Sequence, residues 1–372
     1  MLVLIMNNSI SSRQIILLVF ISVTTTYSII DMPKFMAQSF GRSSWLPLIV
    51  GGIVFAAAVC LIAHINSMYP NVIFFDYAKN ITGSFVAYIF TLFYILYFLI
   101  VEVNLNVRLV GILSSNFLPR TPFYIFLAIS IGISAFLASK GLKNICRLIE
   151  ITGVAFLVVT LFICIVMVTN GNKNNILPIF NANDFKNMKE SVKELMLPFA
   201  GIEILLIVPF TRENKGIGKK LFITLLLIGL FYALIVISTI KILGINNTSL
   251  LNDAFFEAVK SAPAPIIERL DVIYMTFGLA SLFTGFGIMF IAITEHACKV
   301  FSKVDRKWII IITAVIVFGL SILGIKTEAT EKSRNIITLL VAVAVFVIPL
   351  ILFAVAKIKR QNKAGLNAEV QE

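Results

Sequence analysis

Two stretches of the sequence place helix-breaking and polar residues inside apolar runs. One covers residues 24–28, which read Thr-Thr-Thr-Tyr-Ser, and is followed by Asp31 and Pro33. The other covers residues 197–203, with a proline, an Ala-Gly pair and Glu203. A helix broken at membrane depth has free N–H and C=O groups that need partners, and a zwitterionic amino acid offers a carboxylate and an ammonium. The two stretches indicate either a site for such a ligand or two simple kinks.

Three ionisable residues lie within apolar segments. Glu102 and Arg108 are six residues apart, about 240° around a helix, so they do not pair with each other and each needs another partner. Glu102 is near the predicted outer end of its segment, where it either reaches the interface or acts in the site. Glu203 is deeper, and an acid at that depth is a functional candidate by default. We slightly favour a structural role for Glu203, as a partner for free backbone in its own segment.

A third feature is a face with little bulk in the segment that begins near residue 269. Ser281, Gly285 and Met289 follow each other at intervals of four residues, with Thr284 beside them, and so share one side of a helix. Such a face either allows two helices to pack closely or forms a wall of a cavity. The sequence leaves both interpretations open.

No pattern in the sequence indicates catalysis or a metal site. His64 and His296 are far apart, and the four cysteines show no C-x-x-C spacing. The glycine-containing run at 215–220 lacks the spacing and the Ser or Thr of a phosphate loop. We expect no enzyme activity, no metal and no cofactor, with H⁺ or Na⁺ as the only candidate coupling ions.

The composition indicates a protein that spans a lipid bilayer. Of the 372 residues, 59% are apolar and 13% are charged, about half the charge of a soluble domain. The net charge of +12 is spread singly or in small groups between apolar runs, which is typical of multi-span membrane proteins and argues against nucleic-acid binding. Soluble enzymes and disordered chains are excluded on the same grounds.

A membrane-crossing helix needs about 20 apolar residues, and the sequence contains ten runs of about this kind. They lie at about 14–31, 45–64, 84–107, 121–139, 148–169, 195–210, 220–243, 269–293, 308–325 and 335–357. We predict an all-α integral membrane protein with one transmembrane domain over 1–372. Two inverted five-helix repeats would cover about 14–169 and 195–357, each beginning with a broken helix, followed by a short tail at 358–372. Loop charge places both termini in the cytoplasm, and the intervals 170–194 and 244–268 read as surface loops.

Short motifs along nearly the whole chain resemble the B subunits of the spore germinant receptors, which belong to the amino acid–polyamine–organocation superfamily. The matching pieces are Asp31-Met-Pro33-Lys34, Trp45, Tyr69-Pro70, Arg120-Thr121-Pro122, Gly141-Leu142 with Arg147, Leu177-Pro178, Phe199-Ala200-Gly201-Ile202-Glu203 and Ile267-Glu268-Arg269-Leu270-Asp271. Their order and spacing carry the resemblance. It implies a LeuT-like core of ten helices and a role in sensing small amino acids in the spore inner membrane, together with A and C subunits.

The resemblance also implies positions for a ligand pocket in the middle of the membrane. Carried over by position, the pocket would consist of Thr26, Tyr27, Ser28, Val101, Ala200, Gly201, Thr284, Gly285 and Met289. Glu268 and Arg269 match the family's most regular pair, with a structural or partner-docking role. The family usually has glycines at the first break, where this chain has Thr26 and Ser28, so its ligand could differ in size or polarity.

Three functions are consistent with these features. The first is a receptor subunit with a transporter fold, which binds a small amino acid and signals to its partners. The second is an amino-acid transporter, with Glu203 or Glu102 carrying a proton, or with Ser281 or Thr284 and backbone carbonyls holding Na⁺. The third is a membrane scaffold that has lost its binding site. Only the resemblance favours the first.

Overall fold

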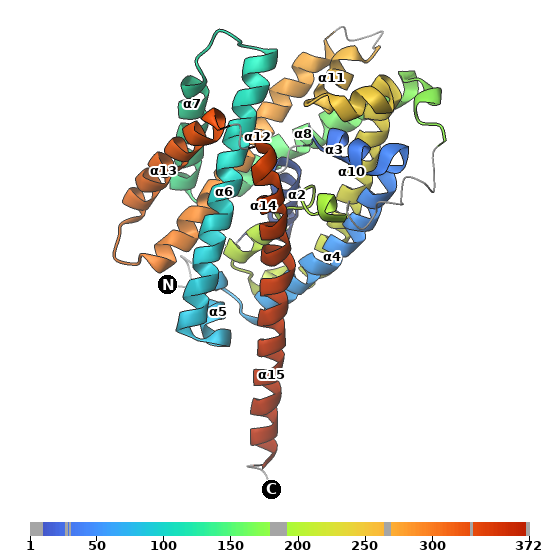
Figure 1. Cartoon of the computed structure of the whole chain (residues 1–372). Helices are drawn as coiled ribbons and strands as arrows, with labels where there is room; N and C mark the ends of the chain where they lie inside the picture. Colours follow the sequence, from blue (N-terminus) through green and yellow to red (C-terminus); the bar gives the residue numbers. More distant parts are fainter. Residues whose placement is uncertain are drawn as a thin grey trace.

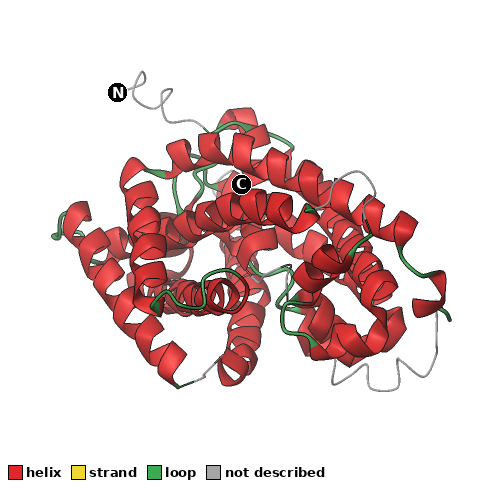
Figure 2. Cartoon of the chain, turned by 90° about the horizontal axis from the view of Figure 1, so that it is seen from above, coloured by secondary structure: helices red, strands yellow, loops and turns green. Residues whose placement is uncertain are grey.

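The computed structural model describes residues 10–26, 29, 31–178, 192–263, 269–327 and 330–369, and across these residues the chain forms helices and turns without any strand (Figures 1 and 2). Eight helices are long and apolar enough to cross a membrane. They are α4 (Trp45–Met68), α6 (Ser84–Asn116), α7 (Phe123–Lys140), α8 (Leu142–Asn170), α10 (Ile217–Leu250), α12 (Leu270–Val300), α13 (Arg306–Lys326) and the continuous Arg334–Lys359. The chain is therefore an integral membrane protein, and eight of the predicted spans are confirmed.

The first and sixth predicted spans are the two that do not form continuous helices. The first is divided into α2 (Ser12–Thr26) and α3 (Met32–Phe40), with Pro33 in the first turn of α3. The sixth contains only short 3₁₀ turns, at Val192–Leu195 and Ile202–Ile207, among its described residues. Both predicted breaks are present, at the start of each predicted repeat.

The last span changes its winding part-way along. It consists of α14 (Thr330–Ala342), a π-helical turn (Val343–Val347) and α15 (Ile348–Glu369). The lower part of α15 projects away from the other helices and ends near the C-terminus (Figure 1). By the predicted orientation this end of the bundle is cytoplasmic, and α11 lies at the opposite end.

Two predicted loops contain helical structure that a search for long apolar runs does not find. The interval 244–268 was expected to be a surface loop, but α10 continues through a kink at Gly244 to Leu250, and α11 (Ala254–Ser261) follows. A further short helix, α5 (Phe74–Thr82), precedes α6. Helices α5 and α11 are amphipathic and have fewer than ten residues, so they lack the apolar length on which the span prediction depends.

Close helix packing holds the bundle together. In lipid, helices associate through van der Waals contact and polar bonds, which small residues permit. Helix α10 packs along α4, where a Cβ atom added to Gly52 would lie 3.1 Å from the Gly229 Cα atom. Helix α12 packs against α2, α6, α7 and α8, and so forms the centre of the bundle. This arrangement places α12 beside the first break.

Candidate functional site

The first break begins at hydroxyl side chains that bond back to their own helix. Thr24 Oγ1 donates to the Phe20 carbonyl oxygen at 2.8 Å, and Thr25 Oγ1 donates to the Ile21 carbonyl oxygen at 2.7 Å. Such bonds satisfy the hydroxyls without a ligand and weaken the end of the helix. The predicted ligand residues Tyr27 and Ser28, and the side chain of Thr26, lie outside the described residues.

The second break contacts the first through Gly201. The φ angle of Gly201 is +112°, a conformation that favours glycine. A Cβ atom on Gly201 would also lie 2.7 Å from the backbone carbon and oxygen of Ser22 in α2. Ser22 Oγ donates to the Gly201 carbonyl oxygen at 2.8 Å. The second break therefore contacts the C-terminal part of α2 directly, with a glycine required at the point of contact and the buried Ala200 beside it.

Glu203 bonds the backbone that the second break leaves free. Its side chain is fully buried, and both carboxylate oxygens accept hydrogen bonds from the Gly201 N–H, at 2.9 and 3.0 Å. The hydroxyl of Tyr97 on α6 donates to the same carboxylate. A buried acid with these donors stabilises the non-helical turn, and this is the structural arrangement that the sequence analysis favoured.

Helix α12 faces α2 through the predicted face of low bulk. A Cβ atom on Gly285 would lie 2.1 Å from Thr25 Oγ1 and 2.6 Å from Thr25 Cβ, so Gly285 allows a very close approach. Thr284 Oγ1 donates to the Ala280 carbonyl oxygen at 2.7 Å, and Met289 is fully buried. The Ser281 hydroxyl oxygen is buried without a hydrogen-bond partner among the described residues. In this conformation the face packs against α2.

The polar groups of α6 lie in two separate environments. Val101 and Glu102 are buried in the middle of α6, and a Glu102 carboxylate oxygen accepts a hydrogen bond from Asn106 Nδ2 at 3.3 Å. Because α6 continues to Asn116, Glu102 lies fourteen residues before the end of its helix, and its side chain is fully buried. Arg108 forms an ion pair with Asp31 at the start of α3, so Glu102 and Arg108 have separate partners, as predicted.

The family-implied pair at the start of α12 is described only in part. Glu268 lies outside the described residues. The Arg269 side chain is 70% exposed and forms a two-point interaction with Asp271, at 2.9 and 3.0 Å. Arg269 is therefore an accessible surface group near the predicted outer end of α12.

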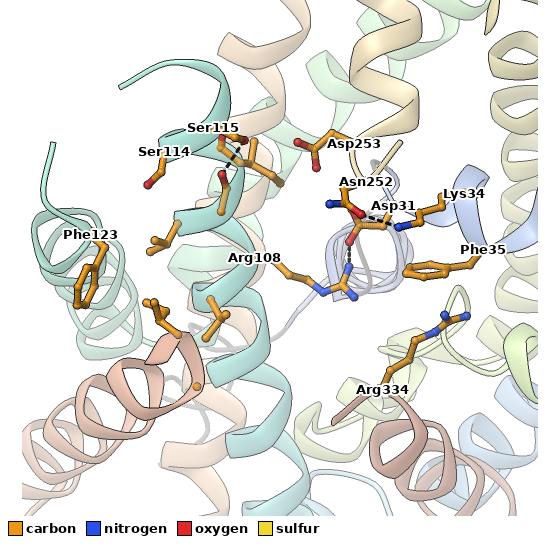
Figure 3. Close-up of a pocket in the computed structure, with 16 residues that line it drawn as sticks. Asp31, Lys34, Phe35, Arg108, Ser114, Ser115, Phe123, Asn252, Asp253 and Arg334 are labelled. Atoms are coloured by element: carbon orange, nitrogen blue, oxygen red, sulfur yellow. Dashed lines mark hydrogen bonds and ion pairs between the residues drawn. The ribbon is translucent and has the colours of Figure 1, made fainter. Parts of the chain in front are cut away.

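Two cavities lie near the first break. A small cavity of about 20 Å³ is lined by Thr24, Thr25 and Ile29 together with residues of α8 and α12. A cavity of about 800 Å³ lies next to the start of α3, between α6, α13, α14 and the loop that joins α10 to α11 (Figure 3). None of the described ligand residues predicted from the sequence lines either cavity.

The larger cavity, which we call the outer cavity, has charged residues that the sequence analysis did not assign to a site. Asp31 and Lys34 were noted only as part of a motif, and Asp253 and Arg334 were not noted. The only feature of the sequence that pointed to this cavity was the presence of charged residues next to apolar spans. It could not show that these residues share a site, because they come from segments far apart in the chain.

Residues 9–332 match the family model described as spore germination protein. Among curated proteins, the chain is similar to spore germination protein YndE of Bacillus subtilis (strain 168), with 24% identity over 280 residues, 74% of this chain and 77% of the relative. Spore germination protein KB of the same organism is 22% identical over 366 residues, 95% of this chain and 97% of the relative. Spore germination protein GerLB of Bacillus cereus is 22% identical over 349 residues, 90% of each chain.

Solved structures with a similar fold are transporters. The substrate-bound, outward-open Na⁺-coupled sialic acid symporter superposes with a TM-score of 0.65 at 12% identity, covering 90% of this chain and 79% of that one. The nucleobase-cation-symport-1 family transporter Mhp1 superposes with a TM-score of 0.64 at 13% identity, covering 93% and 77%. At these identities the likeness concerns the fold, and it confirms the predicted LeuT-like class.

Proposed function

Since the chain belongs to the spore germination protein family, we propose that it is the membrane subunit of a nutrient germinant receptor in the spore inner membrane. It binds a small germinant beside the two broken spans, and the family resemblance of the sequence motifs implies that this germinant is an amino acid. Binding triggers germination through the A and C subunits. The curated relatives that cover most of this chain support the germination role.

The observation that carries this proposal is the close contact of the C-terminal part of α2 with the second break and with α12. Ser22 and Thr25 of α2 pack against Gly201 and Gly285 with no room for an added Cβ atom. A ligand that binds here has to separate these elements, because their backbones already touch. A ligand shifts an equilibrium only if it prefers one of the two states. The packed contact is the unliganded state, and its opening is the event that the partner subunits sense.

Substitution of Gly201 tests the proposal. Gly201→Leu places a side chain where the backbone of Ser22 lies, so we expect loss of the germination response to every amino acid. Gly319→Leu is the matched control, because Gly319 is exposed on α13 with nothing within 4 Å of an added Cβ atom. Membrane abundance and melting temperature of the variants exclude a folding defect. An unchanged response in a folded Gly201→Leu protein would contradict the proposed site.

The alternative is an amino-acid transporter coupled to H⁺ or Na⁺. It is supported by the transporter-like fold, by the buried acids Glu102 and Glu203, and by the buried hydroxyl of Ser281. Uptake into liposomes that is lost in Glu102→Gln or Glu203→Gln would indicate H⁺ coupling through these acids. Uptake that requires Na⁺ and is lost in Ser281→Ala would indicate a Na⁺ site beside α2.

A further inference from the structure

The outer cavity is large enough for a small ligand and lies immediately beyond the first break. Its volume of about 800 Å³ is within the range of about 300–1,000 Å³ that is typical of ligand pockets. Asp31, in its wall, directly precedes the first residue of α3. None of the described residues of the proposed mid-membrane site lines the outer cavity, so binding in the cavity does not depend on them.

The two arginines of the outer cavity have carboxylate partners. Arg108 forms an ion pair with Asp31, and Arg334 forms an ion pair with Glu194. Arg334 also stacks on Phe35, with its guanidinium carbon 3.5 Å from the ring centroid. These pairs join α3 to α6 and α14 to the 3₁₀ turn at Val192–Leu195, where the sixth span begins, and they neutralise the charges on both arginines.

Lys34 and Asp253 differ from the arginines, because each is bonded to a neutral amide. Lys34 Nζ donates to Asn252 Oδ1 at 2.5 Å, and Asp253 Oδ2 accepts from Asn116 Nδ2 at 2.9 Å. Neither forms an ion pair with a described residue. Burial raises the pKa of the Asp253 carboxyl, whereas the hydrogen bond from Asn116 and the more distant charges of Arg108 and Lys260 lower it. Both side chains would gain from an oppositely charged partner.

The positions of Lys34 and Asp253 suit a ligand that carries both charges close together. The Lys34 ammonium touches the side chain of Asn252, whose Cα is about 3.8 Å from that of Asp253. Figure 3 shows Asn252 between Lys34 and Asp253, with Phe123 across the cavity. The far wall is largely apolar and includes Val107 and Ile325.

We propose that the outer cavity is a second ligand site, which binds a zwitterionic amino acid with an apolar side chain. The ligand carboxylate binds Lys34, its ammonium binds Asp253, and its side chain contacts the wall of Phe123, Val107 and Ile325. A ligand bound there lies at the predicted outer end of the helix bundle, beside the first break. The site therefore concentrates the amino acid next to the contact that it has to open.

The test uses the full chain in lipid nanodiscs and titration calorimetry with L-leucine and two analogues. The first analogue, 4-methylpentanoate, lacks the ammonium, and the second, isopentylamine, lacks the carboxylate. We expect Lys34→Gln to lower the affinity for leucine and for 4-methylpentanoate by about tenfold or more. The affinity for isopentylamine should stay unchanged. Asp253→Asn should lower the affinity for leucine and for isopentylamine by a similar factor. The affinity for 4-methylpentanoate should stay unchanged.

Two controls separate binding from folding. Lys173→Gln removes an exposed positive charge from the predicted outer interval 170–194 that does not line the cavity and does not act on Asp253, so it should not change leucine affinity. Lys34→Arg keeps the positive charge and should retain most of the affinity. The melting temperatures of Lys34→Gln and Asp253→Asn should stay close to that of the parent chain.

Three results would overturn the inference. The first is no leucine binding by the parent chain. The second is unchanged leucine affinity in both Lys34→Gln and Asp253→Asn. If that binding were lost instead in Gly201→Leu, the mid-membrane site would be supported and the outer site rejected. The third is binding of either single-charge analogue as tightly as leucine, because the site would then not recognise a zwitterion.

Discussion

The packed contact of α2 with α12 and the sixth span differs from the outer cavity in how its residues fill space. Where α2 meets α12 and the sixth span, glycines remove all side-chain volume, and backbone and hydroxyl groups bond to each other. In the outer cavity, on the other side of the break, a volume of about 800 Å³ stays open between charged side chains. The packed region has no room for a ligand until its helices move, whereas the outer cavity has room already.

In the proposed function, the two regions therefore have different tasks: the outer cavity stays open, and the mid-membrane contact opens when the ligand binds. Ion pairs hold the outer cavity in shape, because Arg108 and Arg334 connect elements that are distant in the sequence. Small residues hold the mid-membrane contact, which consists of many weak interactions that can be exchanged for ligand contacts. A receptor needs a stable entrance and a contact that opens, and the two kinds of packing match these needs.

The largest effect is expected when the ion pair of the outer cavity is broken. Arg108→Met leaves the carboxylate of Asp31 without its partner, and both side chains are nearly nine-tenths buried. We expect a loss of about 3 kcal/mol in the free energy of unfolding. Denaturant titration of the purified chain measures it. The double variant Asp31→Asn with Arg108→Met should recover part of the loss, and a cost below about 1 kcal/mol for Arg108→Met would contradict this view.

A smaller loss is expected when bulk is added to the packed region. Gly285→Ala forces a Cβ atom to within 2.1 Å of Thr25 Oγ1 and 2.6 Å of Thr25 Cβ, so α2 or α12 has to shift. Overpacking of this kind costs about 1–3 kcal/mol, measured as a lower melting temperature and unfolding free energy. Gly132→Ala on α7 is the control, since an added Cβ atom there meets nothing within 4 Å. Equal stability of the two variants would mean that the contact is loose.

Removal of the hydrogen bond between α2 and the second break should change the sensitivity to the germinant more than the stability of the protein. Ser22→Ala deletes the bond to Gly201, which contributes about 1 kcal/mol to the packed state. If the germinant binds the separated state, the concentration for half-maximal germination should fall about fivefold. Dose–response curves of spores that carry each form measure this shift. An unchanged or a higher concentration for half-maximal germination would argue that this contact is not the element that opens.

The smallest effect on stability is expected at the surface of α12. Arg269 is largely exposed, so Arg269→Gln should leave the melting temperature within experimental error. The same variant tests the docking role implied for this position. A weaker germination response at unchanged stability would support partner docking, and an unchanged response would leave Arg269 as an ordinary surface residue.

Much of the fold could be predicted because membrane spans are long and apolar. Eight spans and both breaks follow from hydropathy and from Pro198, Gly201 and the hydroxyl run before Asp31. The short helices α5 and α11 were missed, since an amphipathic segment of fewer than ten residues has no such signal. The end of α6 was also misplaced: it continues nine residues past the predicted end at 107.

The site could be predicted only where one segment carries the information. A role for Glu203 as a partner for backbone could be predicted, because the Gly201 N–H that donates to it lies in the same turn. The contact of Gly285 with Thr25 needed the distance between two helices. The outer cavity combines residues from α3, α6, α14 and the α10–α11 loop, and a single sequence contains no information on how far apart these residues lie.

The most direct test of the account uses the purified chain in liposomes and a panel of labelled amino acids. Counterflow measures whether the protein carries a ligand across the bilayer, and thermal stabilisation of the same preparation measures whether it binds one. A receptor subunit should be stabilised by at least one amino acid and show no counterflow, because its breaks open to signal and do not complete a transport cycle. Counterflow of that amino acid would contradict the account and make the protein a transporter.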